Sequence, residues 1–270
     1  MSADVLAVLF LLGVVVALPA WTVVCLRRSP YTPLQSGLYF IDLLLTRILW
    51  RAEVRGGLPS GQGAVLVANH TSSIDPCFIQ LAAGRVVPWM IAREYFQHWA
   101  YGWLLRTIKA IPTNRSGIDT VATRQAIRYA AEGGLVGIFP EGRINMSDQF
   151  MLAGRPGAAM IALTARVPVV PVYIGGAPYD QTPYGALLMP ARVRIVLGSP
   201  IDLSPYYGRG RERDVLQQLT LKFMSEIARL AGVEEFQPQL ASRRWNPSHR
   251  ELKMTMAQSV RRKRTAGTTP

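Results

Sequence analysis

The sequence predicts an α/β fold, in which a mostly parallel sheet is covered by helices on both faces and preceded by N-terminal membrane-anchoring helices. The first observation behind this prediction is a regular alternation of short apolar runs and helix-like segments from Gly63 onward, which is typical of strands joined by crossover helices. The second is an uncharged apolar stretch near the N-terminus, which is long enough to span a bilayer. The length of 270 residues suits one α/β domain with appendages at its ends.

The N-terminal stretch, residues 5–26, carries no charged side chain and is followed by Arg27 and Arg28. Basic residues next to a membrane helix stay on the cytosolic side, and Asp4 stands where a signal peptide would be basic, so we expect an uncleaved anchor. Pro19 would kink this helix, and a helix that dips into one leaflet without crossing is the alternative. The protein is therefore predicted to lie at the cell membrane, with its main domain on the cytoplasmic side.

A second segment, residues 34–52, places apolar side chains such as Leu38 and Ile41 at helical spacing, with Asp42 on another face. Its position next to the apolar stretch and its aromatic residues favour an interfacial helix. The alternative is an ordinary amphipathic helix that packs on the core. With the first stretch, this segment is predicted to make residues 1–55 a membrane anchor.

Residues 56–235 are predicted to form the α/β domain, which opens with a linker rich in glycine and proline. Short apolar runs bounded by turn residues indicate strands, and longer periodic segments indicate helices. The expected strands are residues 64–68, 86–91, 108–112, 135–139, 169–174 and 193–197. The expected helices lie near residues 76–83, 94–106, 119–132, 156–165 and 212–231.

The chain carries 30 basic and 17 acidic residues, a net charge of +13, although 49% of it is hydrophobic. Nucleic acid and an anionic membrane face are the two partners that such a charge suits. The basic residues are not accompanied by a nucleic-acid-binding motif, so we expect membrane lipids as partners and no nucleic acid. A phosphate-bearing substrate fits the same charge. The basic C-terminal tail, residues 236–270, is predicted either to bind anionic headgroups or to be merely solvated.

The segment 69–75, Asn-His-Thr-Ser-Ser-Ile-Asp, follows the expected buried strand 64–68 and carries one of the three histidines. On a regular helix His70 and Asp75 would point about 140° apart, so they can meet only across a non-helical turn. If they meet, Asp75 can hold one imidazole nitrogen protonated and leave the other free to take a proton from a hydroxyl. The alternative is that His70 caps a turn and Asp75 caps a helix.

A second informative stretch is residues 137–143, Gly-Ile-Phe-Pro-Glu-Gly-Arg, where another apolar strand runs into a charged turn. Pro140 fixes the exit of the strand and Gly142 lets the backbone approach a ligand. Glu141 and Arg143 are thereby presented on a tight loop. In a parallel sheet this loop would open on the same edge as the histidine motif, whereas an ordinary surface turn with an Arg–Glu pair is the alternative.

A third stretch delivers Arg115 just after the expected strand 108–112. A guanidinium in this place could bind a phosphate through paired hydrogen bonds. The fourth stretch, residues 167–172, reads Val-Pro-Val-Val-Pro-Val and offers no reactive group. Its role is predicted to be structural.

The order N-H-x4-D, an arginine after a strand, F-P-E-G and V-P-x-V-P resembles that of the glycerolipid acyltransferases, most closely the bacterial 1-acyl-glycerol-3-phosphate acyltransferase group. The resemblance covers roughly residues 63–198, and four ordered motifs are more specific than any one of them. The two N-terminal apolar segments also resemble the membrane-docking helices of that group.

The resemblance implies that a fatty acyl group passes from acyl-CoA or acyl-carrier protein to the free hydroxyl of lysophosphatidic acid. His70 would be the general base, and Asp75 would orient its ring. Arg115 would bind the phosphate of the acceptor, and Glu141 with Gly142 would hold its glycerol. The resemblance implies neither a metal nor a cofactor beyond the acyl donor.

Two arginines complete the predicted substrate-binding set. Arg93 falls where the family usually has a basic residue. Arg143 comes one position before the arginine of the family's F-P-E-G-T-R, and Ile144 stands at that position. This departure leaves the reaction type intact and allows a different acceptor, either another lysolipid or glycerol-3-phosphate.

Two further function classes are weighed against this one. A metal-dependent hydrolase could use His70, Asp75 and Glu141 as ligands, but His98 lies in an aromatic segment and His249 in the tail, so neither is an obvious further ligand. A non-catalytic membrane-surface protein could be built from the N-terminal segments and the tail, but it would leave the ordered motifs unexplained.

Overall fold

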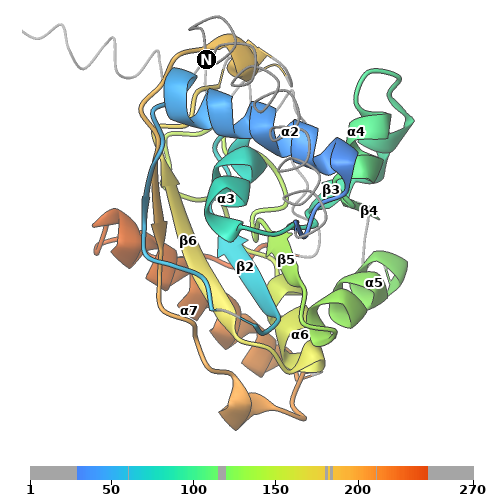
Figure 1. The fold of residues 1–270 in the computed structure, drawn as a ribbon. Helices are drawn as coiled ribbons and strands as arrows, with labels where there is room; N and C mark the ends of the chain where they lie inside the picture. The colour runs from blue at the N-terminus through green and yellow to red at the C-terminus, as the bar shows by residue number, and fades with distance from the viewer. Residues whose placement is uncertain are drawn as a thin grey trace, which may run out of the picture.

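The computed structural model describes residues 29–59, 61–114, 120–179, 182, 185–210 and 212–242. Its main sheet has five strands in the order β1-β7-β6-β2-β5 (Figure 1). Neighbouring strands run parallel except β6 and β7, which are antiparallel, so the predicted mostly parallel sheet is confirmed. The strands are β1 (Glu53–Arg55), β2 (Ala64–Ala68), β5 (Leu135–Ile138), β6 (Val169–Gly175) and β7 (Arg194–Leu197).

Strand β2 divides the core into two layers, because successive side chains of a strand point to opposite faces. Val65 and Val67 pack in one apolar cluster, and Leu66 and Ala68 pack in another. The first cluster is covered by α5 (Thr120–Ala131), α6 (Gly157–Ala165) and α7 (Arg213–Ala231). The second is covered by α3 (Asp75–Ala83) and by the end of α2 (Pro33–Leu44) with the π-helical turn η1 (Leu45–Leu49). A strand buried on both faces reads as an unbroken apolar run, as β2 does.

Two of the expected strands lie outside the main sheet. β3 (Met90–Ala92) and β4 (Ile111–Thr113) pair with each other in a separate parallel sheet. The expected helix 94–106 is also split, into η2 (Arg93–Gln97) and α4 (Gly102–Thr107). A Cβ atom at Gly102 would lie 2.4 Å from the Phe96 carbonyl oxygen, so the chain folds back on itself at a point where only glycine fits. Short 3-10 turns form η3 (Gly185–Leu188) and η4 (Ser204–Tyr206).

Helix α2 begins with a capping box, in which the Thr32 hydroxyl accepts from the Gln35 N–H and the Gln35 side chain accepts from the Thr32 N–H. The same Gln35 side chain donates to the Thr107 carbonyl oxygen at 2.7 Å and so ties α2 to α4. No helix within the described residues is long and apolar enough to cross a membrane. The expected helix at residues 5–26 lies outside the described residues, as does the tail from residue 243.

The parallel pairing of β2 with β5 and β6 brings the carboxyl ends of these strands to one edge of the sheet. Trp89 packs against β5 at Gly137, where an added Cβ atom would lie 2.5 Å from the indole ring. Trp89 in turn stacks on Phe139, with ring centroids 4.4 Å apart. The lack of a side chain at Gly137 thus sets the position of an aromatic stack at the sheet edge.

We expect Gly137→Ala to lower the free energy of unfolding by about 1–3 kcal/mol, because the added methyl group overpacks the Trp89 ring. Urea denaturation followed by circular dichroism measures this change. Gly157→Ala is the matched control, since a Cβ atom there meets nothing within 4 Å and alanine is favoured over glycine in a helix. A Gly137→Ala variant as stable as the Gly157→Ala variant would contradict this packing.

Candidate active site

The histidine motif leaves β2 at a point where Asn69 clamps the chain to the neighbouring strand. Asn69 is buried, its side-chain amide donates to the Ile174 carbonyl oxygen at 2.8 Å, and its side-chain oxygen accepts from the Ile174 N–H at 2.8 Å. This pair of bonds continues the β2–β6 ladder beyond the last strand residue. The residue that follows, His70, therefore starts from a fixed backbone position.

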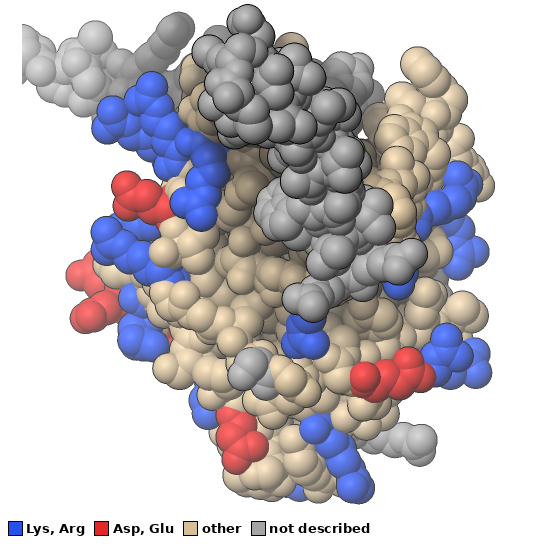
Figure 2. All heavy atoms as spheres, viewed as in Figure 1, with Lys and Arg blue, Asp and Glu red and all other residues tan. Residues whose placement is uncertain are grey.

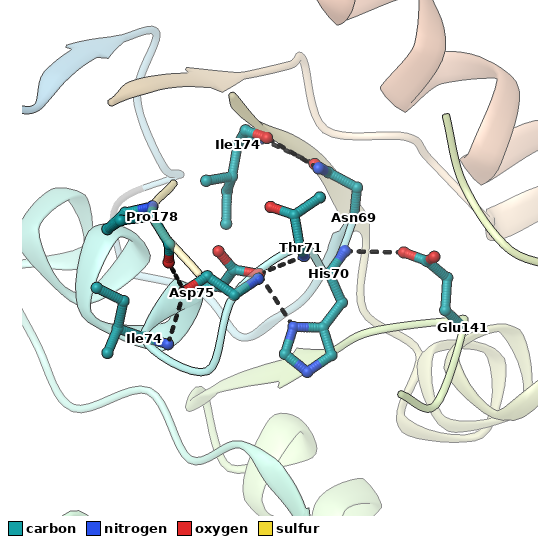
Figure 3. A network of polar contacts seen from close by, with 9 residues as sticks. Asn69, His70, Thr71, Ile74, Asp75, Glu141, Ile174 and Pro178 are labelled. Carbon is teal, nitrogen blue, oxygen red and sulfur yellow. Dashed lines mark hydrogen bonds and ion pairs between the residues drawn. The ribbon is translucent and has the colours of Figure 1, made fainter. Parts of the chain in front are cut away.

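The turn after His70 closes around one oxygen of Asp75 (Figure 3). Asp75 Oδ2 accepts from the Thr71 N–H at 2.7 Å and the Ser72 N–H at 2.8 Å, and it lies 3.0 Å from His70 Nδ1. The residues between His70 and Asp75 are not helical, and α3 begins at Asp75 itself. The predicted meeting of the two side chains across a non-helical turn is therefore present in the structure.

The geometry of the pair selects one tautomer of the histidine. A carboxylate only accepts hydrogen bonds, so Nδ1 carries the proton that is donated to Asp75 and Nε2 keeps its lone pair. The imidazole stacks on Phe139, with ring centroids 3.8 Å apart and planes 7° from parallel. Asp75 is fully buried, whereas the His70 side chain is 15% exposed. The site thus holds an oriented base that is still accessible on one side.

Glu141 lies on the side of His70 opposite Asp75 (Figure 3), and its carboxyl group is hydrogen-bonded to backbone N–H groups. Its carboxyl oxygens accept from the His70 N–H and the Leu152 N–H, both at 2.8 Å, and the residue is fully buried. Burial raises the pKa of Glu141 to about 8, although the two N–H donors lower it. Glu141 therefore supports the backbone of the histidine motif. The family resemblance implied a different contact, in which Glu141 holds the glycerol of the acceptor.

The other predicted substrate-binding residues are less closely gathered. Gly142 is exposed with φ of +68°, and the Arg155 side chain passes within 3.5 Å of the position that a Cβ atom would occupy there. Arg143 is half-buried in the same turn, and Arg93 is exposed at the start of η2. Arg115 lies outside the described residues.

Several supporting residues were not identified from the sequence. Phe139 and Trp89 form the aromatic stack behind His70, and Asn145 donates its backbone N–H to the His70 carbonyl oxygen at 2.7 Å. The Ser72 hydroxyl donates to the Pro178 carbonyl oxygen. Only Phe139 carries a sequence signal, since it opens the F-P-E-G motif; the others are brought in by tertiary contacts.

Over the described part of the chain, no group of three or more His, Cys, Asp or Glu side chains is placed to hold a metal ion. In particular, Glu141 directs both carboxyl oxygens at backbone N–H groups instead of sharing a centre with His70 and Asp75. The ligand set that a metal-dependent hydrolase would need is not assembled by these three residues.

Comparison with known proteins identifies the same region. Residues 51–175 match the family model described as Acyltransferase. The chain is 27% identical over 152 residues to a 1-acyl-sn-glycerol-3-phosphate acyltransferase of Bacillus subtilis, which covers 55% of this chain and 72% of that protein. It is 35% identical over 129 residues to the human 1-acyl-sn-glycerol-3-phosphate acyltransferase alpha, which covers 45% of this chain and 44% of that protein. The chain thus spans less than half of the human relative.

The fold has a counterpart among solved structures. The crystal structure of the 1-acyl-sn-glycerophosphate (LPA) acyltransferase from Thermotoga maritima superposes with a TM-score of 0.56 at 20% sequence identity, over 76% of this chain and 81% of that one. Residues 51–175, which match the family model, contain both the His70–Asp75 pair and Glu141. Residues 51–175 of the chain therefore match the acyltransferase family of enzymes, and the chain is similar to proteins that are named as 1-acyl-sn-glycerol-3-phosphate acyltransferases.

Proposed function

We propose that the protein transfers a fatty acyl group from acyl-CoA or acyl-carrier protein to the free hydroxyl of lysophosphatidic acid, giving phosphatidic acid. The observation that carries the proposal is the buried Asp75 carboxylate 3.0 Å from His70 Nδ1, which leaves Nε2 as a free base at an accessible position. The names of the relatives support this acceptor. Another lysolipid or glycerol-3-phosphate is the alternative acceptor.

The reaction is a general-base acyl transfer. His70 Nε2 takes the proton of the acceptor hydroxyl as its oxygen attacks the thioester carbonyl carbon, and Asp75 stabilises the imidazolium that forms. The tetrahedral intermediate then collapses, the carbon–sulfur bond breaks, and the thiolate leaving group takes the proton back from Nε2. The ester is formed and the donor thiol is released, so the enzyme returns to its starting state.

The charge of the chain fits a phosphate-bearing lipid as substrate. We assign the acceptor phosphate to Arg115, with Arg143 and Arg93 as further basic residues around the site, in a chain of net charge +13. Gly142 would let the acceptor approach the backbone. Residues 5–26 and the basic tail would hold the enzyme at the cytoplasmic face of the cell membrane.

Glu141 acts in this proposal through the backbone of His70. Because both carboxyl oxygens accept from N–H groups, the residue joins the exit of β2 to the loop that follows β5. Its role is to position His70, which differs from the acceptor contact implied by the family resemblance.

His70→Ala is expected to lower kcat by about a hundredfold to ten-thousandfold, because it removes the general base. Transfer of labelled acyl-CoA to lysophosphatidate by the purified protein measures this. His98→Phe is the control and should leave the rate unchanged, since His98 is exposed on the turn before α4 and phenylalanine keeps a ring to stack on Tyr101. Full activity of His70→Ala would refute the mechanism, and loss of wild-type activity with a chelator would favour a metal-dependent hydrolase.

Arg115→Ala is expected to raise the KM of the lysophosphatidate acceptor far more than that of the acyl donor, because the lost guanidinium would bind the acceptor phosphate. Arg128→Ala provides a matched loss of charge on α5, where the Arg128 side chain is 78% exposed. Steady-state kinetics with each substrate varied in turn separates the two effects. Equal rises for donor and acceptor would be inconsistent with the assigned contact.

Glu141 should make the protein less stable as the pH rises. The carboxyl keeps its proton in the folded state up to about pH 8 but loses it near its ordinary value of 4.5 when unfolded. Between these values the folded state binds more protons, so the free energy of unfolding falls with increasing pH. Glu141→Gln should reduce this fall, and it should also cost about 1–3 kcal/mol, because the amide nitrogen cannot accept from a backbone N–H.

Urea denaturation at pH 5 and pH 8 measures both effects. Asp42→Asn is the control for the effect of pH alone, because burial also raises the pKa of Asp42, to about 7, but its carboxyl oxygens accept from neither of these two N–H groups. A Glu141→Gln variant with the full wild-type loss of stability between the two pH values would show that Glu141 is ionised throughout.

A further inference from the structure

We propose that the turn carrying Trp99 and Trp103 and the turn carrying Leu188 enter the interface of an anionic lipid bilayer on either side of α2. This inference rests on the proposed function and deepens it, because it assigns the surface through which the enzyme meets its lipid substrate. The expected interfacial helix covers residues 34–52 only, so both turns are additional contacts.

The first observation is the exposure of large apolar side chains. Trp99 is 88% exposed, Leu188 is 83% exposed and Ile48, on η1, is 70% exposed. Trp103 on α4 and Leu44 on α2 are also exposed. Single exposed apolar residues are common on soluble proteins, but a group gathered at one end of a molecule marks an interaction surface.

These side chains come from segments that the structure joins together. The Gln35 side chain of α2 donates to the Thr107 carbonyl oxygen at the end of α4. At the other end of α2, the Ala191 N–H donates to the Leu49 carbonyl oxygen at 3.2 Å, and the Val193 N–H donates to the Trp50 carbonyl oxygen at 3.1 Å. The η3 turn that carries Leu188 is therefore tied to η1, and the tryptophan turn is tied to the start of α2.

The tryptophan turn is ordered by its own contacts. The Gly102 N–H donates to the His98 carbonyl oxygen at 2.8 Å, and the Trp103 indole N–H donates to the Ala100 carbonyl oxygen at 2.9 Å. The His98 and Tyr101 rings stack with centroids 4.0 Å apart. A cluster of rings that have both an apolar body and a polar atom suits the boundary between lipid and water.

The charges beside these turns favour an anionic surface. Five exposed basic side chains flank the apolar residues: Arg47 and Arg51 by η1, Arg106 and Lys109 by α4, and Arg192 after η3. Figure 2 shows Lys and Arg side chains on both flanks of this end of the molecule, with α4 at the upper right as in Figure 1. Basic residues next to an apolar contact strengthen binding to a membrane that carries negative lipids.

The placement also suits the chemistry of the site. In Figure 1, α2 lies across the end of the molecule toward which β2 and β5 run, and α4 lies beside it. His70 follows β2 at that same end. An enzyme docked through α2 and the two turns would therefore present the carboxyl edge of its sheet to the membrane, where a lysolipid and its product reside.

The test uses the full chain in vesicles whose lipids carry bromine on the acyl chains, which quenches tryptophan fluorescence only within the bilayer. We expect the wild-type protein to lose part of its fluorescence in such vesicles, and the Trp99→Phe Trp103→Phe double variant to lack that part. Phenylalanine keeps the turn apolar, so docking is retained while the reporters are removed. Phosphatidylglycerol added to phosphatidylcholine should increase the quenching, and salt should reduce the increase.

A matched pair of reporters in the double-variant background locates the second turn. A tryptophan introduced by Leu188→Trp should be quenched by the brominated lipid, whereas one introduced by Val121→Trp should be quenched by aqueous acrylamide. Val121 is 61% exposed on α5 and lies outside the proposed surface.

Three results would overturn the proposal. The wild type and the double variant could show equal quenching by brominated lipid while a tryptophan introduced by Leu188→Trp stays unquenched, which would place both turns in water. Trp99 and Trp103 could be protected from both brominated lipid and acrylamide while the molecular mass of the protein in solution rises with its concentration. This result would indicate that a second copy of the chain covers the surface. Protection at constant mass would indicate that residues 1–28 cover the surface. None of these measurements needs turnover, so the proposed acyl transfer can hold even if the docking surface fails.

Discussion

Asp75 Oδ2 accepts from two backbone N–H groups and from the His70 ring, and the geometry of the site depends on this buried oxygen. The backbone bonds fix the turn between β2 and α3, and the ring bond fixes the tautomer of the histidine. A fully buried carboxylate is costly unless it is hydrogen-bonded, so the turn and the ion stabilise each other. The same contacts that make the turn fold also leave Nε2 free as a base.

The sheet extends this arrangement to more distant parts of the chain. Asn69 is bonded to Ile174 on β6, and Glu141 after β5 is bonded to the His70 N–H. β6 thus contributes two hydrogen bonds to Asn69, and the loop after β5 contributes one to His70. Because β5 and β6 are parallel to β2, the three strand ends reach the same edge. A parallel sheet is therefore what allows motifs far apart in sequence to act on one histidine.

Local pattern was sufficient to predict the central elements, but it left the meeting of His70 and Asp75 open, and the pair was chosen only because the other ordered motifs resemble an acyltransferase. β2 and β6 are unbroken apolar runs, and the spacing of the two residues already required a non-helical turn. The separate pairing of β3 with β4 and the split at Gly102 depend on contacts with Trp89 and Phe96, which no local pattern reports. For the same reason Glu141 could be identified as a site residue from its motif, whereas its bonds to the His70 and Leu152 backbone could not.

The tautomer of His70 decides whether Nε2 can act as the base, and nitrogen NMR of protein labelled at its histidine rings measures this tautomer. The His70 signals are assigned by their absence from His70→Ala, which leaves the other two histidines of the chain in place. Neutral His70 is expected to carry its proton on Nδ1, and Asp75→Asn is expected to abolish this preference. A neutral His70 with its proton on Nε2 in the wild-type protein would refute the role of His70 as the base, because no lone pair would then face the acceptor hydroxyl.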